Sequence, residues 1–152
     1  MTIRIAVGEA PFDVGAEMAA IQQPGVGGIG CFVGVVRGRV AHGGSGLLAL
    51  RLEHYPAMTE RAIERIAHSA VARFGLLGCT VIHRTGTLVV GAPIVLVLSA
   101  AAHRQAALDG TEFLIDWLKT QAPFWKCEMF EDGTKAWVEA RADDEAAVAR
   151  WS

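Results

Sequence analysis

Lysine and cysteine are scarce in this 152-residue chain, and long apolar runs are missing. The longest unbroken aliphatic stretch, residues 94–98, is too short to span a bilayer, and the first residues lack the apolar block of a secretory signal. The three cysteines are far apart and odd in number, so they predict neither a disulfide framework nor a CxxC metal site. A net charge of −2 argues against a nucleic-acid binder driven by overall charge. These absences predict a soluble, cytoplasmic protein with no nucleic-acid or membrane partner.

What is present is enough for one hydrophobic core. Apolar residues make up 52% of the chain and charged residues 20%, which excludes a disordered protein. The sequence has no internal repeat, no low-complexity tract and no linker. We therefore expect residues 1–152 to form a single domain.

Hydrophobic periodicity predicts alternating strands and helices. We expect strands at residues 3–7, 29–36, 48–52, 80–85 and 94–98, helices at 12–22, 56–74 and 102–120, a hairpin of 124–131 with 135–139, and a last short helix ending near residue 151. Interleaved helices and hairpins predict an α+β fold, a mostly antiparallel sheet with helices packed against it.

Local signals refine these elements. Asp13 is placed to begin the first helix and Gly75 to end the second, while Asp143 could cap the last one. Leu48, Leu50 and Leu52 alternate with Ala49, Arg51 and Glu53, which predicts one buried and one polar strand face. Met58 is expected on the inward face of the second helix. The glycine-rich residues 37–46 predict a mobile loop with little packing.

Two apparent motifs do not predict a cofactor or a metal. Gly25–Gly30 matches G-x-G-x-x-G, but a β-branched run follows it where a dinucleotide site needs a helix N-terminus, so a turn into a strand is the better interpretation. The five histidines show no metal-ligand spacing. His83 alternates with Ile82 in a strand and is interpreted as a structural imidazole.

Cys127 lies between Lys126 and Glu128, and a lysine neighbour can activate a thiol. Successive strand residues point to opposite faces, however, so the thiol and the amine should diverge. A catalytic thiol is therefore the less favoured interpretation.

The lysines have an unusual distribution. The chain has three, Lys119, Lys126 and Lys135, against eleven arginines, and the first two lie seven residues apart around Ala122–Trp125. Lys119 could simply complement a helix C-terminus, which contributes about 0.3–1 kcal/mol, and Lys126 could occupy a surface strand. The alternative is that the pair is functional.

Further cations strengthen the functional interpretation. His103 and Arg104 stand at the start of the helix that ends with Lys119, where backbone N–H groups and a guanidinium favour a phosphate. Arg37 ends an apolar strand, a position that often presents a side chain to a ligand. Together these residues predict a cationic pocket for an anionic small molecule.

Seven runs of the chain, in collinear order, carry a resemblance to a known family: residues 32–37, 52–58, 81–86, 102–104, 115–119, 122–128 and 137–140. The two longest motifs are LEHYPAM and APFWKCE. These runs resemble the catalytic (large) subunit of molybdopterin synthase, the MoaE family, and the resemblance covers nearly the whole chain.

The resemblance implies an α/β hammerhead fold and a sulfurtransferase with no cofactor of its own. Such enzymes install the dithiolene sulfurs of molybdopterin on cyclic pyranopterin monophosphate. The sulfur arrives as a thiocarboxylate on the C-terminal Gly-Gly tail of a small ubiquitin-like partner, within a heterotetramer built around a homodimer of catalytic subunits.

By motif match, Lys119 and Lys126 fall on the essential lysines of that family. We expect Lys119 at the reacting centre beside the tail, and Lys126 in pterin positioning and proton transfer. Arg37, His103 and Arg104 are the expected phosphate and pterin anchors. The resemblance also places four further residues at the substrate site: Val35, Val36, Cys127 and Glu128. Family members often have a basic residue at the position of Cys127.

Arg104 and Lys119 are fifteen residues apart on one helix, or roughly 22 Å at 1.5 Å per residue. One small pterin can hardly touch both side chains of a single helix. We therefore expect a pocket at a two-fold interface, with His103 and Arg104 supplied by the neighbouring subunit.

Two other functions remain open from the residues. One is a non-catalytic module that binds a phosphorylated pterin or a similar anion, which would tolerate Lys119→Arg because the charge persists. The other is a thiol-dependent transferase, which Cys127→Ser would inactivate.

Overall fold

The computed structural model describes residues 2–41, 43–138 and 142–152, and contains four helices and two four-stranded sheets in those ranges. The chain order is β1 (Thr2–Gly8), α1 (Val14–Ile21), β2 (Gly28–Val35), β3 (Leu47–His54), α2 (Met58–Phe74), β4 (Gly78–Arg84), β5 (Gly86–Val89), β6 (Pro93–Ala101), α3 (Arg104–Gln121), β7 (Phe124–Phe130), β8 (Lys135–Val138) and α4 (Ala142–Ala149). The α+β prediction is confirmed, with two sheets where the sequence analysis expected one.

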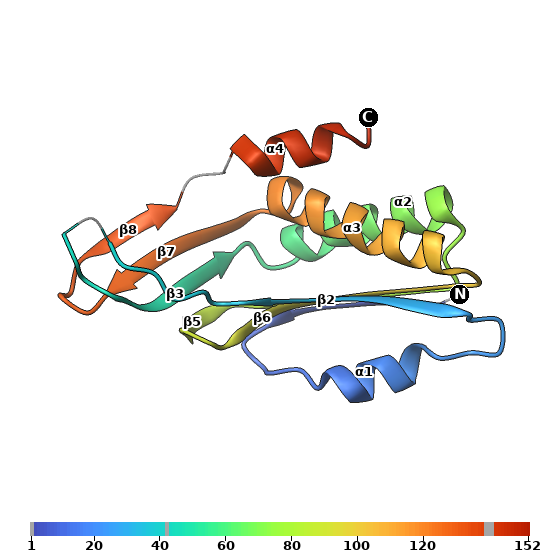
Figure 1. The fold of residues 1–152 in the computed structure, drawn as a ribbon, viewed down its shortest axis with the longest axis horizontal. Coiled ribbons are helices and arrows are strands. Elements are labelled where there is room, and N and C mark those ends of the chain that lie inside the picture. Colours follow the sequence, from blue (N-terminus) through green and yellow to red (C-terminus); the bar gives the residue numbers. More distant parts are fainter. Residues whose placement is uncertain (1, 42, 139–141) are drawn as a thin grey trace.

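The first sheet has the order β1-β4-β6-β2, with β1 and β4 parallel and the other pairs antiparallel. Helices α2 and α3 lie side by side over one face, and α1 covers the opposite face (Figure 1). The central strands β4 and β6 are therefore buried on both sides, and their apolar residues belong to two separate clusters. The larger cluster joins the sheet to α2 and α3.

The second sheet has the order β5-β3-β7-β8 and is antiparallel throughout. It has its own small core around Leu52, Leu88 and Phe130. The chain passes from the first sheet to the second between β4 and β5, at Gly86, whose φ of +82° disfavours a side chain. Strand β7 follows α3 directly, so this sheet also receives the residues that come after Lys119.

Helix α3 approaches β2 very closely at Gly30. A Cβ added to Gly30 would lie 2.4 Å from both the Ala107 carbonyl oxygen and the Thr111 hydroxyl, and the Thr111 hydroxyl already donates to that carbonyl. The segment Gly25–Gly30 thus begins in a turn and continues into β2, which starts at Gly28, as the sequence predicted. Its last glycine serves helix–sheet packing.

The predicted helix boundaries agree closely with the structure. The Asp13 carboxylate accepts a hydrogen bond of 3.0 Å from the Ala16 N–H and begins α1. Gly75 ends α2 in the left-handed region, with a φ of 64°. In the described ranges, no helix combines the length and the low polarity that a membrane span needs.

Two burial predictions were wrong. Leu48 is 51% exposed, because a register shift between Leu47 and Ala49 breaks the alternation and buries those two residues in its place. Met58 is 56% exposed, because it is the first residue of α2 and lies before the helix passes over the sheet. The short strand β5 was also missed, since four residues give too weak a periodic signal.

The glycine-rich segment between β2 and β3 makes more contacts than predicted. The Ala41 N–H donates to the Ser45 carbonyl at 2.7 Å, and Ala41 packs against the core of the second sheet. Arg39 forms a two-pronged ion pair with Glu128 on β7, with N···O distances of 2.5 and 2.6 Å. A guanidinium that grips a carboxylate in this way fixes the segment over the second sheet. His42 lies outside the described residues.

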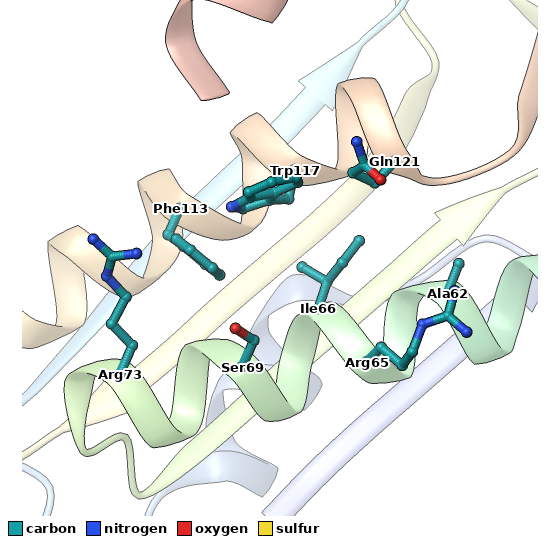
Figure 2. A pocket seen from close by; sticks show the side chains of 8 residues that line it. All are labelled: Ala62, Arg65, Ile66, Ser69, Arg73, Phe113, Trp117 and Gln121. Carbon is teal, nitrogen blue, oxygen red and sulfur yellow. The ribbon is translucent and has the colours of Figure 1, made fainter. Parts of the chain in front are cut away.

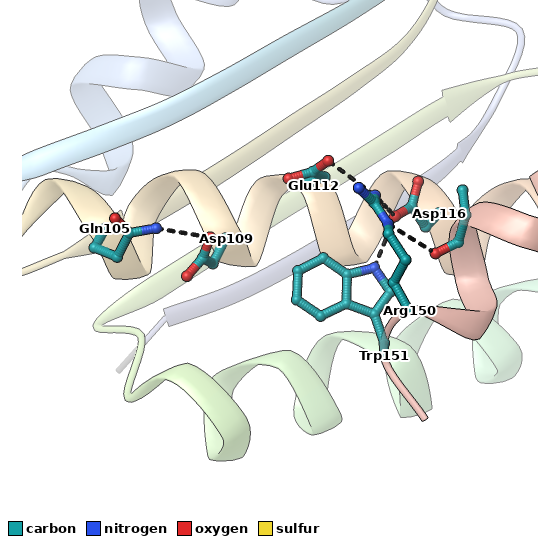
Figure 3. A network of polar contacts seen from close by, with 7 residues as sticks. Gln105, Asp109, Glu112, Asp116, Arg150 and Trp151 are labelled. Carbon is teal, nitrogen blue, oxygen red and sulfur yellow. Dashed lines mark hydrogen bonds and ion pairs between the residues drawn. The ribbon is translucent and has the colours of Figure 1, made fainter.

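Helix α4 is joined to α3 by a polar cluster (Figure 3). The buried Asp116 carboxylate accepts hydrogen bonds of 2.7 Å from the Arg150 guanidinium and from the Trp151 indole N–H, and Arg150 also reaches Glu112. The Trp151 ring packs edge-on against Phe113. The Asp143 side chain and residue 139 lie outside the described part, so the predicted cap and hairpin end are not tested.

Candidate functional site

Lys119 and Lys126 are carried by elements that meet at a short turn. Lys119 is in the last turn of α3, and Lys126 is the third residue of β7. The Thr59 hydroxyl of α2 is fully buried and donates to the Pro123 carbonyl at 3.2 Å, which fixes the turn between them. The sequence places a proline here because it stops α3 while the chain reverses into a strand.

Both lysines line one cavity of about 260 Å³. The cavity lies where the end of α3 and the start of β7 face β2, β4 and β6. Two lysines and one histidine are its polar side chains, and the other lining residues are apolar or glycine: Phe32, Val33, Gly34, Val35, His83, Ile94, Val95, Val97, Ile115, Leu118, Lys119, Ala122, Phe124 and Lys126. Such a cavity suits a small ligand whose orientation depends on a few polar contacts.

The surroundings of Lys126 in the cavity destabilise its charged form. Burial lowers the pKa of this amine, and the neighbouring Lys119 ammonium lowers it further. The Asp144 carboxylate of α4 acts in the opposite direction. Lys119 is the more exposed of the two side chains. Lys126 is therefore better suited than an ordinary surface lysine to give or take a proton near neutral pH.

His83 belongs to the same cavity, although its position in a strand had suggested only a structural imidazole. Its ring stacks on Phe124 with a centroid distance of 3.8 Å and an interplanar angle of 18°. Burial lowers the pKa of His83 to about 4, against the opposing effect of a hydrogen bond with the Arg84 carbonyl. The charges of Lys126 and Lys119 lower this pKa further, so the imidazole is neutral at physiological pH.

Three site residues were predicted at the end of a strand, and they lie in different surroundings in the structure: Val35, Val36 and Arg37. Val35 lines the cavity. Val36 is fully buried in the core of the second sheet, because neighbouring strand residues face opposite ways. Arg37 is exposed just beyond β2 and does not line the cavity.

His103 and Arg104 are exposed at the opposite end of α3 from Lys119. Helix α3 begins at Arg104, so the rise of roughly 22 Å between Arg104 and Lys119 applies to the folded chain. Within one chain, the structure does not bring His103 and Arg104 to the cavity that Lys119 and Lys126 line.

Cys127 and Glu128 face other surroundings. Cys127 is buried in the second sheet, and its sulfur lies 3.9 Å from the Glu128 carbonyl oxygen. The Glu128 carboxylate is engaged by Arg39. Neither residue lines the cavity that Lys126 lines.

A second cavity of about 260 Å³ lies between α2 and α3 (Figure 2). It is lined by side chains such as Arg65, Arg73, Phe113 and Trp117, and by none of the residues that the sequence predicted at a site. Residues 2–41, 43–138 and 142–152 contain no group of three or more His, Cys, Asp or Glu side chains that could hold a metal ion.

Comparison with known proteins gives consistent matches over most of the chain. The model of the MoaE protein family matches residues 7–121. The molybdopterin synthase catalytic subunit of Rhizobium meliloti (strain 1021) is 46% identical over 153 residues, which cover 99% of this chain and 96% of that protein.

Solved structures agree with the sequence matches. The MoaE protein of Burkholderia ambifaria MC40-6 superposes with a TM-score of 0.82 at 44% identity, over 98% of this chain and 97% of that one. Molybdopterin synthase from Staphylococcus aureus gives a TM-score of 0.81 at 25% identity, over 88% of this chain and 96% of that one.

Proposed function

This chain belongs to the MoaE family, and from that premise we propose that the cavity of Lys119 and Lys126 is where it transfers sulfur to a pterin. The chain is the catalytic subunit of a molybdopterin synthase and acts in molybdenum cofactor biosynthesis. The observation that carries the assignment of the site is that two of only three lysines, from different elements, line one largely apolar cavity.

The sulfur donor we propose is a small ubiquitin-like partner with a C-terminal Gly-Gly thiocarboxylate. A tail of two glycines is thin enough for an apolar cavity of this size, and its negative end complements two ammonium groups. The acceptor is cyclic pyranopterin monophosphate, which becomes molybdopterin when the dithiolene sulfurs are installed. No cofactor is needed, because the donor sulfur is already a nucleophile.

The two lysines take different roles in this scheme. Lys119, the more exposed, holds the thiocarboxylate terminus while its sulfur bonds to the pterin. It then stabilises the oxyanion that develops when water attacks the resulting thioester, so that the sulfur stays on the pterin and the tail leaves as a carboxylate. Lys126, whose pKa is lowered by burial and by Lys119, positions the pterin and moves a proton. The apolar lining lowers the polarity around these groups, which strengthens both electrostatic contacts.

We propose that Arg37, His103 and Arg104 hold the phosphate and the pterin in the assembled enzyme. The length of α3 separates the last two from the lysines of the same chain, so they are contributed by the second catalytic subunit of a homodimer inside a heterotetramer. A monomeric variant that keeps full activity with the small subunit would contradict this arrangement.

Residues 1–152 act as one catalytic domain in this proposal, and the reaction takes place in the cytoplasm. All three cysteines are free thiols, as expected for a reducing compartment.

Reconstitution with the thiocarboxylated small subunit and cyclic pyranopterin monophosphate tests the function. Wild-type protein should form dithiolene product, and Lys119→Ala should slow it by about 10²–10³-fold, the usual effect of removing an oxyanion-stabilising donor. Lys135→Ala is the matched control, since this exposed lysine of β8 does not line the cavity. Equal loss in both variants would refute the role of Lys119.

Substitution with arginine separates catalysis from mere binding. Lys119→Arg keeps the charge but changes the geometry, so it should bind the pterin and still lose most of the turnover. Full turnover in Lys119→Arg would favour the alternative, a module that only binds a phosphorylated pterin or a similar anion.

A further inference from the structure

His83 is the polar residue of the cavity to which the proposed function assigns no role. It lies on β4 and is 8% exposed, so its ring is almost entirely enclosed by protein. Phe124 stacks on one face of the ring, and the Arg84 carbonyl oxygen lies 2.9 Å from Nδ1. Arg84 is itself held, since its guanidinium donates to the Glu9 and Pro93 carbonyls. The orientation of the imidazole is therefore fixed from two sides.

The contact with Arg84 also fixes the tautomer. A carbonyl oxygen only accepts hydrogen bonds, so Nδ1 must carry the proton, and Nε2 keeps its lone pair. Within the described ranges, the buried side-chain atoms that lack any partner are Ser99 Oγ and Trp117 Nε1. His83 Nε2 is not one of these buried, unpartnered atoms. In those ranges, the only hydrogen bond of the His83 ring is made by Nδ1. The free edge of the ring therefore opens to the cavity that His83 lines.

Apart from His83, the cavity has no side chain that accepts a hydrogen bond while both lysines are protonated. An ammonium group donates and never accepts, so Lys119 and Lys126 in this form bind only acceptors of a ligand. The remaining lining side chains are apolar. A pterin ring carries N–H donors as well as acceptors, and a donor buried without a partner costs about 1–3 kcal/mol.

Resting on the proposed function, we infer that His83 determines specificity: its Nε2 accepts a hydrogen bond from an N–H donor of the bound pterin. The lysines then bind the anionic parts of the reactants, while the neutral imidazole recognises the heterocycle. Burial and the lysine charges lower the pKa of the imidazole, so this acceptor persists at neutral pH.

Two substitutions of His83 distinguish the effect of losing the hydrogen-bond acceptor from the effect of losing the ring packing. His83→Phe keeps an aromatic ring against Phe124 and removes the acceptor, whereas His83→Gln can place an amide oxygen near the position of Nε2. We expect His83→Phe to raise the KM for the pterin about tenfold, with the KM for the thiocarboxylated partner unchanged, and His83→Gln to recover most of the loss. Equal pterin KM values in wild type and His83→Phe would overturn the inference.

A spectroscopic measurement on the wild-type protein covers the case in which His83→Phe does not fold. In protein with ¹⁵N-labelled histidine, the Nε2 signal of His83 should be that of an unprotonated nitrogen and should shift when pterin is added without the sulfur donor. A signal that does not move on saturation with pterin would overturn the inference.

These results can be distinguished from failure of the proposed function. Dithiolene formation by wild type with an unmoved Nε2 signal rejects the role of His83 and leaves sulfur transfer intact. A shifted signal without dithiolene formation supports the acceptor role and rejects the transfer reaction.

Discussion

The close approach of α3 to β2 predicts that Gly30→Ala damages both stability and catalysis. The new Cβ would lie 2.4 Å from the Ala107 carbonyl oxygen and from the Thr111 hydroxyl, where ordinary contact begins at 3.4 Å. Relief of this overlap requires α3 to move away from the sheet by about 1 Å. Lys119 is carried by the same helix, so the displacement is transmitted to the cavity.

The expected magnitude follows from that overlap. Forcing an extra methyl group into a packed contact costs about 1–3 kcal/mol. A displacement of about 1 Å at a reacting group can reduce turnover by up to ~10²-fold. Urea unfolding measures the first effect, and dithiolene formation in the reconstituted enzyme measures the second.

Gly28→Ala is the matched control on the same strand. Its Cβ would lie 3.5 Å from the Arg104 Cα, an ordinary contact, and it gains about 0.5–1 kcal/mol because alanine has less backbone freedom to lose than glycine. Both variants gain this backbone contribution, so their unfolding free energies should differ by the cost of the overlap, about 1–3 kcal/mol, with Gly30→Ala the less stable. Equal stability and equal turnover of the two variants would refute the packing argument.

Three further outcomes are expected. Lys119→Met removes a positive charge that lowers the pKa of Lys126, so that pKa should rise, which titration of the lysine ¹³Cε signals by NMR measures. Cys127→Ser should keep turnover within about threefold, because the thiol is buried away from the cavity; loss of turnover would favour the thiol-dependent mechanism. Asp116→Asn should weaken the attachment of α4 by about 1–2 kcal/mol and speed amide exchange in α4, and unchanged exchange would refute the role of the polar cluster.

The elements with strong local signals could be predicted from the sequence. Helix α2 has a long periodic face and a terminal glycine, and α3 ends at a proline, so their boundaries are nearly those observed. The exposure of Leu48 could not be predicted, because a bulge depends on how β3 pairs with β7 and leaves no mark in the alternation of its own residues. The division into two sheets is likewise a matter of long-range pairing.

The site could be predicted from the sequence only in part, for the same reason. Lys119 and Lys126 could be paired because they lie close in sequence around a turn. His83 could not, since β4 is far from β7 in the chain, and only the folded structure brings the His83 ring onto Phe124. The one available signal was its position in the run 81–86 that resembles the MoaE family.

Helix α3 explains why the cations divide into two groups. It is an element of eighteen residues, roughly 27 Å long, with Arg104 at its first residue and Lys119 in its last turn. A phosphorylated pterin bound by the lysines therefore lies far from the Arg104 of the same chain. If His103 and Arg104 bind that phosphate, the active site is complete only when a second catalytic subunit brings the start of its own α3 to this cavity.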